Sequence, residues 1–193
     1  MTTGILGGAF DPPHNGHVAL ARAALHCLGL TRLLVSVSDR PGHKQVELAA
    51  PLRLRLAEAA FADVSGAEVR LDEHPFTIDM LEGGEFDGAY FVVGADQLAG
   101  FLAWRDPDRV LEHVRLAVGT RPGYTQALLE PVLEQLQRPE RVVCFPLDEP
   151  VAVSSRELRA LAARGAPLDA LVPSRVARLI SELQLYAPHP APG

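Results

Sequence analysis

Short β-rich runs alternate with helical segments along almost the whole chain, and this alternation limits the fold more than any other feature. Apolar residues form short continuous runs in some segments and recur at helical spacing in others. The expected strands cover residues 4–10, 33–37, 67–71, 90–93, 114–118 and 141–145. The expected helices cover residues 16–28, 52–61, 126–136, 155–164 and 174–183.

This pattern predicts an α/β fold with a doubly wound, Rossmann-like, mostly parallel sheet and helices on both faces, because parallel neighbours need crossover connections. A chain of 193 residues with 48% apolar composition fits one domain better than two. We expect a single domain over residues 1–186 and a flexible tail over 187–193, where the sequence APHPAPG has low complexity. Ligands bind such sheets beyond the carboxyl ends of the strands, so the residues that follow each strand are the first candidates for a site.

Charge and hydropathy exclude several classes of partner. A formal net charge of -6 argues against a protein whose main task is to bind nucleic acid. The sequence has no apolar run long enough to span a membrane and no recognisable secretion signal. We therefore expect a cytoplasmic protein with neither nucleic-acid nor membrane partners. Cys27 and Cys144 lie in apolar stretches without metal-ligand spacing, which predicts buried free thiols.

The first expected strand leads into a pattern that is typical of anion binding. Gly7 and Gly8 end the strand, and His14 and His17 stand three residues apart where the helix begins. Glycines let a phosphate approach the backbone, and a helix start offers unpaired N–H groups with partial positive charge. Histidines that only cap the helix are the structural alternative. A metal site with Asp11 as third ligand is another, but it lacks a closed set of ligands. The segment fits neither a G-x-G-x-x-G nor a P-loop pattern.

The residues from Gly7 to His17 resemble the G-G-x-F-D-P-x-H-x-G-H signature of nicotinate-nucleotide adenylyltransferases. The H-x-G-H core of this signature is shared with other nucleotidyltransferases and with class I aminoacyl-tRNA synthetases. Further segments resemble family motifs in the expected order, at residues 40–44, 75–81, 91–104, 120–123 and 153–159. The resemblance covers nearly all of residues 4–186 and implies the family's fold and reaction.

Four positions depart from the family's motifs. Gly42 stands where the P-P-H-K loop has its second proline. Pro75 and Met80 depart from the S-Y-T-x-D-T-L segment, and Arg156 replaces the threonine of I-S-S-T-x-I-R. These substitutions concern the local backbone and the charge of the motifs, whereas the chemistry-bearing positions beside them match.

The resemblance implies that the protein transfers the adenylyl group of ATP to nicotinate mononucleotide, with Mg²⁺ accompanying ATP. The catalytic residues that it implies are His14, His17, Lys44 and Arg159. The implied ATP-binding residues are Gly7, Gly8, Ala9, Phe10, Gly16, Gly94, Asp96, Ser154 and Ser155. The implied residues for the second substrate are Asp11, Thr77, Trp104 and Arg121, and no residue is assigned to a dedicated metal site.

Several of these residues also have a structural interpretation. Trp104 would stack on the pyridine ring, although a single tryptophan is more often part of a core. Thr77, if it caps a helix, would leave N–H groups for the nicotinate carboxylate. Ser154 and Glu157 predict a capping box, which is compatible with phosphate binding because a capped helix still presents N–H groups.

Two other functions stay open. A related adenylyltransferase could use nicotinamide mononucleotide or phosphopantetheine as acceptor, and Thr77, Trp104 and Arg121 argue against this. A non-catalytic nucleotide-binding module is the second alternative, and the intact phosphate motifs argue against it. A homo-oligomer also stays open, because the sequence does not give the oligomeric state.

Overall fold

The computed structural model describes residues 1–42, 45–120, 126–147 and 153–187. The strands are β1 (Thr3–Gly8), β2 (Arg32–Ser38), β3 (Ala67–Asp72), β4 (Tyr90–Gly94), β5 (Arg115–Thr120) and β6 (Val142–Pro146). The helices are α1 (Asn15–Cys27), α2 (Ala50–Phe61), α3 (Thr77–Leu81), α4 (Ala95–Leu98), α5 (Pro107–His113), α6 (Gln126–Leu133), α7 (Ser155–Ala162) and α8 (Ser174–Glu182). Two short 3-10 turns, η1 (Phe101–Ala103) and η2 (Pro139–Arg141), complete the set within the described residues.

The strands form one six-stranded sheet in the order β3-β2-β1-β4-β5-β6, and every pairing is parallel. The chain moves outward from β1 to β3 and then returns to place β4 on the other side of β1. The order therefore reverses between β1 and β4, which is where such sheets bind ligands. The predicted doubly wound, Rossmann-like fold is confirmed.

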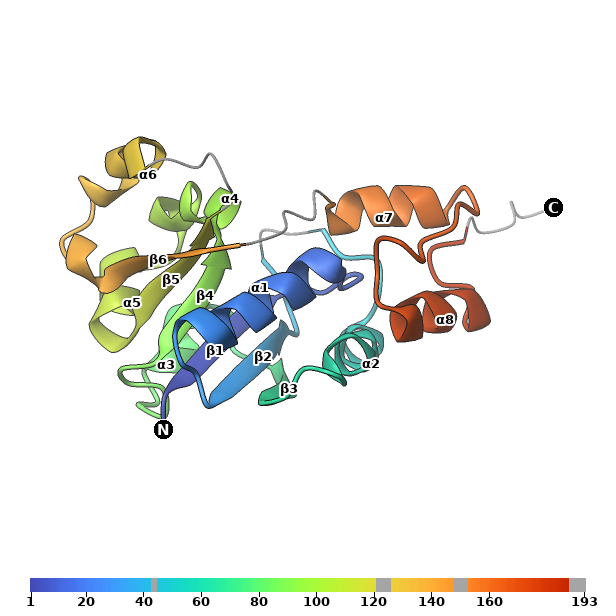
Figure 1. Ribbon diagram of the computed structural model, residues 1–193, viewed down its shortest axis with the longest axis horizontal. Helices are drawn as coiled ribbons and strands as arrows, with labels where there is room; N and C mark the ends of the chain where they lie inside the picture. Colours follow the sequence, from blue (N-terminus) through green and yellow to red (C-terminus); the bar gives the residue numbers. More distant parts are fainter. Residues whose placement is uncertain (43–44, 121–125, 148–152, 188–193) are drawn as a thin grey trace.

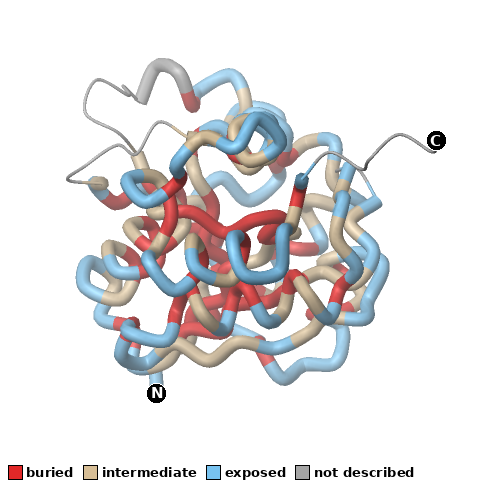
Figure 2. Tube along the Cα trace, turned by 90° about the vertical axis from the view of Figure 1, so that its right-hand side faces the viewer, coloured by how far each residue is buried: buried red, intermediate tan, exposed pale blue. Residues whose placement is uncertain are grey.

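Side chains alternate between the two faces of the sheet and build two cores. On β1, Ile5 packs in the core beneath α3, α4, α5 and α6, whereas Leu6 packs in the core beneath α1, α2, α7 and α8. Helices therefore cover both faces of the sheet, and the buried trace runs through the middle of the molecule in Figure 2. Helices α7 and α8 lie together at one end, where α8 contacts α2 (Figure 1).

The prediction of buried cysteines was wrong, although both thiols are free. Cys27 is the last residue of α1 and is exposed. Cys144 lies on the edge strand β6, where the neighbouring Phe145 takes the covered face. None of the helices in the described part of the chain is long and apolar enough to cross a membrane.

Candidate active site

The two motif histidines lie at the first turn of α1. His14 is the N-cap residue, and its backbone N–H donates to Nδ1 of His17 at 3.2 Å. The two rings are stacked, with centroids 3.7 Å apart. Because Nδ1 of His17 accepts a hydrogen bond, the neutral ring carries its proton on Nε2. His17 is therefore fixed as a donor through Nε2.

The ring of His14 is nearly buried, with 9% of the residue exposed. Its Nδ1 has no hydrogen-bond partner within the described residues. Burial lowers the pKa of His14 from 6.5 to about 4, against a smaller opposing effect of the Glu157 carboxylate. His14 is consequently neutral at physiological pH.

The backbone between β1 and α1 is tightly packed. A Cβ at Gly7 would come within 2.9 Å of Cζ of Phe91, so this position requires a glycine. Phe10 has a φ of +51°, which is uncommon for a bulky residue. Its ring packs edge-on against His17 at 5.0 Å and against Phe61 at 5.8 Å, and these contacts hold the strained backbone in place.

Helix α7 begins beside this loop with the predicted capping box. Oγ of Ser154 accepts the N–H of Glu157 at 3.2 Å, and Oε2 of Glu157 accepts the N–H of Ser154 at 2.8 Å. Oγ of Ser155 donates to the carbonyl of Pro12 at 2.9 Å. The start of α7 is thereby joined to the loop before α1, although the two segments lie more than 140 residues apart in the sequence.

Asp11 and Arg159 are connected through a third segment, residues 45–48. The Asp11 carboxylate accepts the N–H of Glu47 at 2.6 Å and the hydroxyl of Tyr186 at 2.7 Å, and Asp11 is only 1% exposed. Arg159 donates from Nη1 to the Asp11 carbonyl at 2.8 Å and from Nε to Oε1 of Glu47 at 2.9 Å. The side chain of Asp11, expected against substrate, is therefore committed to contacts within the protein.

A cavity of about 640 Å³, called the histidine cavity below, opens over these elements. It gathers most of the residues that the sequence assigned to catalysis and ATP: Gly7, Ala9, Phe10, His14, Gly16, His17, Gly94, Asp96, Ser154, Ser155 and Arg159, together with Asp11. Imidazole, hydroxyl, guanidinium and backbone N–H donors dominate this set, and such donors suit phosphate oxygens.

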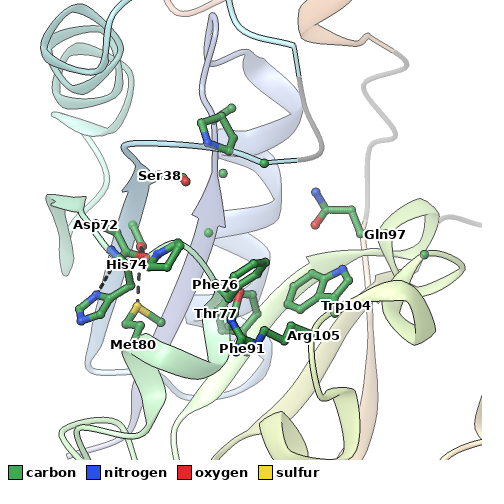
Figure 3. Close-up of a pocket in the computed structure, with 18 of the residues that line it drawn as sticks. Ser38, Asp72, His74, Phe76, Thr77, Met80, Phe91, Gln97, Trp104 and Arg105 are labelled. Atoms are coloured by element: carbon green, nitrogen blue, oxygen red, sulfur yellow. Dashed lines mark hydrogen bonds and ion pairs between the residues drawn. The ribbon is translucent and has the colours of Figure 1, made fainter.

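A second cavity of about 730 Å³, called the tryptophan cavity below, lies beside the first. Trp104 forms one wall and packs edge-to-face against Phe91 and Phe101 with centroids 5.6 and 5.2 Å away (Figure 3). Its indole is thus anchored by the core on one side and faces the cavity with the other. The core and ligand interpretations of this residue are compatible.

Helix α3 forms the floor of the tryptophan cavity beside Trp104. Thr77 is its first residue, whereas the N-cap position belongs to Phe76, so the expectation that Thr77 caps the helix was wrong. The capping role fails because Phe76, not Thr77, has the extended backbone of a cap. The guanidinium of Arg105 lies 4.6 Å from the centre of the Phe76 ring and lines the cavity with it (Figure 3).

The opposite wall of the tryptophan cavity is polar. Asp72 accepts a hydrogen bond from Oγ of Ser36 at 3.2 Å and pairs with Nδ1 of His74 at 2.7 Å. In Figure 3 Asp72 and His74 lie on the side opposite to Trp104. A ring could stack on the aromatic wall while its polar substituents face this side.

The two cavities share Gly7, Ala9 and Gln97 in their linings. They therefore meet at the end of β1 and the start of α4, which is the point where the strand order reverses. Gly8, expected to bind ATP, lines the tryptophan cavity rather than the histidine cavity. Ligands that fill both cavities would approach each other over the glycine-rich turn.

Sequence reasoning assigned no role to Phe76, Gln97, Arg105 and Arg156, which are among the residues that line these cavities. Arg156 carried a signal, because its departure from the family's threonine places a cation at a phosphate motif. Lys44 and Arg121, which the family resemblance implies as phosphate contacts, lie outside the described residues.

A metal centre built by the protein is not found among the described residues, where no three His, Cys, Asp or Glu side chains are grouped to hold an ion. The carboxylate of Asp11, which lies in the same motif as the two histidines, accepts three hydrogen bonds from protein donors. The donor set of the histidine cavity fits phosphate oxygens.

Comparison with known proteins gives a consistent result. A family described as cytidylyltransferase-like matches residues 5–161. The chain is similar to the probable nicotinate-nucleotide adenylyltransferase of Bordetella avium, with 37% identity over 96% of this chain and 98% of that protein. It is likewise similar to the protein of the same description from Chlorobaculum tepidum, with 35% identity over 97% of this chain and 100% of that protein.

A solved structure extends the similarity in three dimensions. The structure described as Plasmodium falciparum nicotinic acid mononucleotide adenylyltransferase complexed with NaAD matches with a TM-score of 0.77. The match covers 96% of this chain and 97% of that chain at 15% identity. At this identity the match shows that the two chains share a fold, and function rests on the closer relatives.

Proposed function

The chain belongs to the nicotinate-nucleotide adenylyltransferase family, within the broader cytidylyltransferase-like family, and from this premise we propose how its two cavities divide the family's reaction. The enzyme transfers the adenylyl group of ATP to nicotinate mononucleotide, a step of NAD biosynthesis. The phosphate of the mononucleotide attacks the α-phosphorus of ATP in line, and pyrophosphate leaves with the electrons of the broken P–O bond. Attack brings two anions together, so the protein's task is positioning and neutralisation of charge.

The single observation that carries the assignment of sites is the wall that the two cavities share at Gly7, Ala9 and Gln97. ATP occupies the histidine cavity, and nicotinate mononucleotide occupies the tryptophan cavity. The α-phosphorus and the attacking phosphate then meet beside Gly7, which lines both cavities.

In the histidine cavity, we assign the triphosphate to the starts of α1 and α7. The Nε2–H of His17 donates to phosphate oxygens whose charge grows during transfer, and His14 lies stacked beside it as a second, neutral imidazole. Ser154, Ser155 and Arg159 face the phosphates from the start of α7. We assign Lys44 to the phosphates as well, on the family resemblance alone. Gly94 and Asp96 contact the adenosine.

In the tryptophan cavity, Trp104 stacks on the pyridine ring. Thr77 lies at the start of α3, where the N–H groups of the first turn meet the nicotinate carboxylate. Arg121 binds the phosphate of the mononucleotide. Arg105 adds a positive charge to the aromatic wall.

Mg²⁺ enters with ATP rather than through a protein cage, and we assign no residue of this chain to it. Magnesium commonly keeps several waters and binds through substrate phosphates. When bound there, it supplies positive charge to the triphosphate. We place the reaction in the cytoplasm, where ATP is available.

An assay of pyrophosphate release tests the proposal. With ATP and Mg²⁺, the enzyme should release pyrophosphate when nicotinate mononucleotide is supplied. Nicotinamide mononucleotide and phosphopantetheine serve as alternative acceptors in the same assay. Turnover of phosphopantetheine without turnover of nicotinate mononucleotide would remove the assignment, and nucleotide binding without release from any acceptor would favour a non-catalytic module.

A further inference from the structure

Tyr186 reaches from the end of the described chain to the loop that precedes α1. Its hydroxyl donates to Oδ1 of Asp11 at 2.7 Å, and the residue is 8% exposed. Its φ of +62° lies in a region where a tyrosine is rare, so its surroundings must hold it there. Tyr186 lines neither cavity, and adenylyl transfer as described above makes no direct use of it.

The Asp11 carboxylate, which accepts the Tyr186 hydroxyl, also contacts residues 45–48. Its Oδ2 accepts the N–H of Glu47 at 2.6 Å and the N–H of Leu48 at 3.5 Å. Burial and the negative charge of Asp11 raise the pKa of the Tyr186 phenol, so the hydroxyl remains protonated and remains a donor. One buried carboxylate thus bridges the end of the chain and the segment 45–48.

The segment 45–48 in turn holds the guanidinium of Arg159, which lines the histidine cavity, through hydrogen bonds. Oε1 of Glu47 accepts Nε of Arg159 at 2.9 Å, and the carbonyl of Gln45 accepts Nη2 of Arg159 at 3.5 Å. Gln45 and Arg159 both line the histidine cavity. On the other side, the buried side chain of Arg53 donates to the Leu48 carbonyl at 3.0 Å and fixes the same segment.

We propose that Tyr186 is a positioning residue for the triphosphate, acting through Asp11 and the segment 45–48 to hold Arg159 and Gln45 in the histidine cavity. The proposal rests on the assignment of ATP to that cavity, but not on the identity of the acceptor. Without the hydroxyl, Oδ1 of Asp11 is buried without its donor, and the carboxylate can turn away from the N–H groups of the segment. None of the linked residues lines the tryptophan cavity, so the effect should fall on ATP.

The test uses the full-length enzyme with the substitution Tyr186→Phe, which removes only the hydroxyl. The matched control is Tyr90→Phe, because the Tyr90 hydroxyl accepts a bond from Arg115 at 3.3 Å at the amino end of β4, the end opposite to the cavities. At a temperature well below the thermal midpoint of both variants, Tyr186→Phe should raise the KM for ATP about tenfold. The kcat and the KM for nicotinate mononucleotide should stay within about twofold of wild type, and Tyr90→Phe should match wild type.

Calorimetric titration with a non-hydrolysable ATP analogue separates this proposal from the assignment of the acceptor. The Kd of Tyr186→Phe should rise by the same factor as the KM, and this measurement needs no acceptor. The variant Asp11→Asn and the double variant Asp11→Asn with Tyr186→Phe complete a double-mutant cycle. If Tyr186 acts through Asp11, the double variant should bind the analogue no more weakly than Asp11→Asn alone. Three results would overturn the positioning role. They are additive losses of analogue affinity in the double variant, an unchanged Kd in Tyr186→Phe, and an equal rise of the KM for ATP and the KM for nicotinate mononucleotide.

Discussion

His14 and His17 belong to one motif, but their surroundings give them different properties. Nδ1 of His17 accepts the N–H of His14, which leaves its proton on Nε2. Burial lowers the pKa of His14 and keeps that ring neutral. In the proposed site the ring of His14 therefore brings no positive charge to the triphosphate. The sequence predicts the position of this pair, but the protonation of the rings depends on burial that only the folded chain shows.

Replacement of His17 with alanine should lower kcat by about a hundredfold or more, because donors aimed at developing charge contribute on the order of 3 kcal/mol to catalysis. Steady-state kinetics at saturating ATP measures this loss. The kinetics should be compared well below the thermal midpoint of the variant, because the substitution also removes the ring contact with Phe10 and the hydrogen bond to the His14 N–H. Turnover close to wild type would remove His17 from the catalytic residues.

The buried ring of His14 should make stability depend on pH. Its pKa is about 4 in the folded protein and 6.5 when unfolded, so the unfolded chain binds more protons between these values. Stability from this residue is present above pH 6.5 and is lost as the pH falls toward 4. Urea unfolding at pH 7.5 and 4.5 should show that wild type loses on the order of 2–3 kcal/mol more than His14→Gln. Equal losses in the two proteins would contradict the shifted pKa.

At the scale of helices and strands, long periodic segments could be predicted and short ones could not. All six strands were expected within two residues of their observed ends, as were α1, α2, α7 and α8. Helix α6 ends at Leu133, three residues earlier than expected. Helices α3, α4 and α5 have only five, four and seven residues, so they show too little periodicity to be read from sequence. Two of these, α3 and α4, help to line the cavities.

Helix α3 provides a test of acid against amide recognition. A carboxylate only accepts hydrogen bonds, so it suits the N–H groups at the start of α3, whereas a carboxamide presents its own donors there. Asp79 adds a negative charge to the first turn of α3, whereas Arg105, which lies over the Phe76 ring and lines the same cavity as Thr77, adds a positive one. The catalytic efficiency should be roughly tenfold or more higher for nicotinate than for nicotinamide mononucleotide.

The variant Arg105→Gln checks the electrostatic part of this argument. Removal of the guanidinium takes a positive charge from the lining of the tryptophan cavity, so the ratio of the catalytic efficiencies for the acid and the amide should fall. The ratio of the two catalytic efficiencies is the quantity to measure in both proteins. Equal efficiencies in the wild type would show that this cavity does not distinguish the acid from the amide.

At the scale of the whole molecule, the parallel topology brings together motifs that lie at the two ends of the chain. The Gly7 to His17 segment and the start of α7 could be predicted because each is a local pattern, and Ser155 joins them through Pro12. The contact of Tyr186 with Asp11 spans 175 residues and has no local pattern. Arg53 likewise donates to the carbonyls of Ala9, Ser38, Asp39 and Leu48, and no spacing in the sequence reveals that it is buried.

The separation of the two cavities should be visible in fluorescence. Trp104 is the only tryptophan of the chain, and it lines the tryptophan cavity but not the histidine cavity. Titration with nicotinate mononucleotide should change its emission saturably, because a stacked pyridine ring alters the surroundings of the indole. ATP alone should change the emission much less. An unchanged signal in an enzyme that demonstrably binds the mononucleotide would make Trp104 a core residue only.

The wall shared by the two cavities also shapes the end of the catalytic cycle. In the proposed division of the sites, each substrate enters one cavity, whereas nicotinate adenine dinucleotide would occupy both at once through two halves joined by its phosphates. When one half of the dinucleotide dissociates from its cavity, the other half keeps it close to that cavity at high effective concentration. The dissociated half therefore rebinds before the other half can leave. The product therefore dissociates as a chelate, more slowly than either substrate, unless one cavity opens to break the pairing. The same geometry makes a linked adenosine–pyridine compound a natural scaffold for an inhibitor of this enzyme.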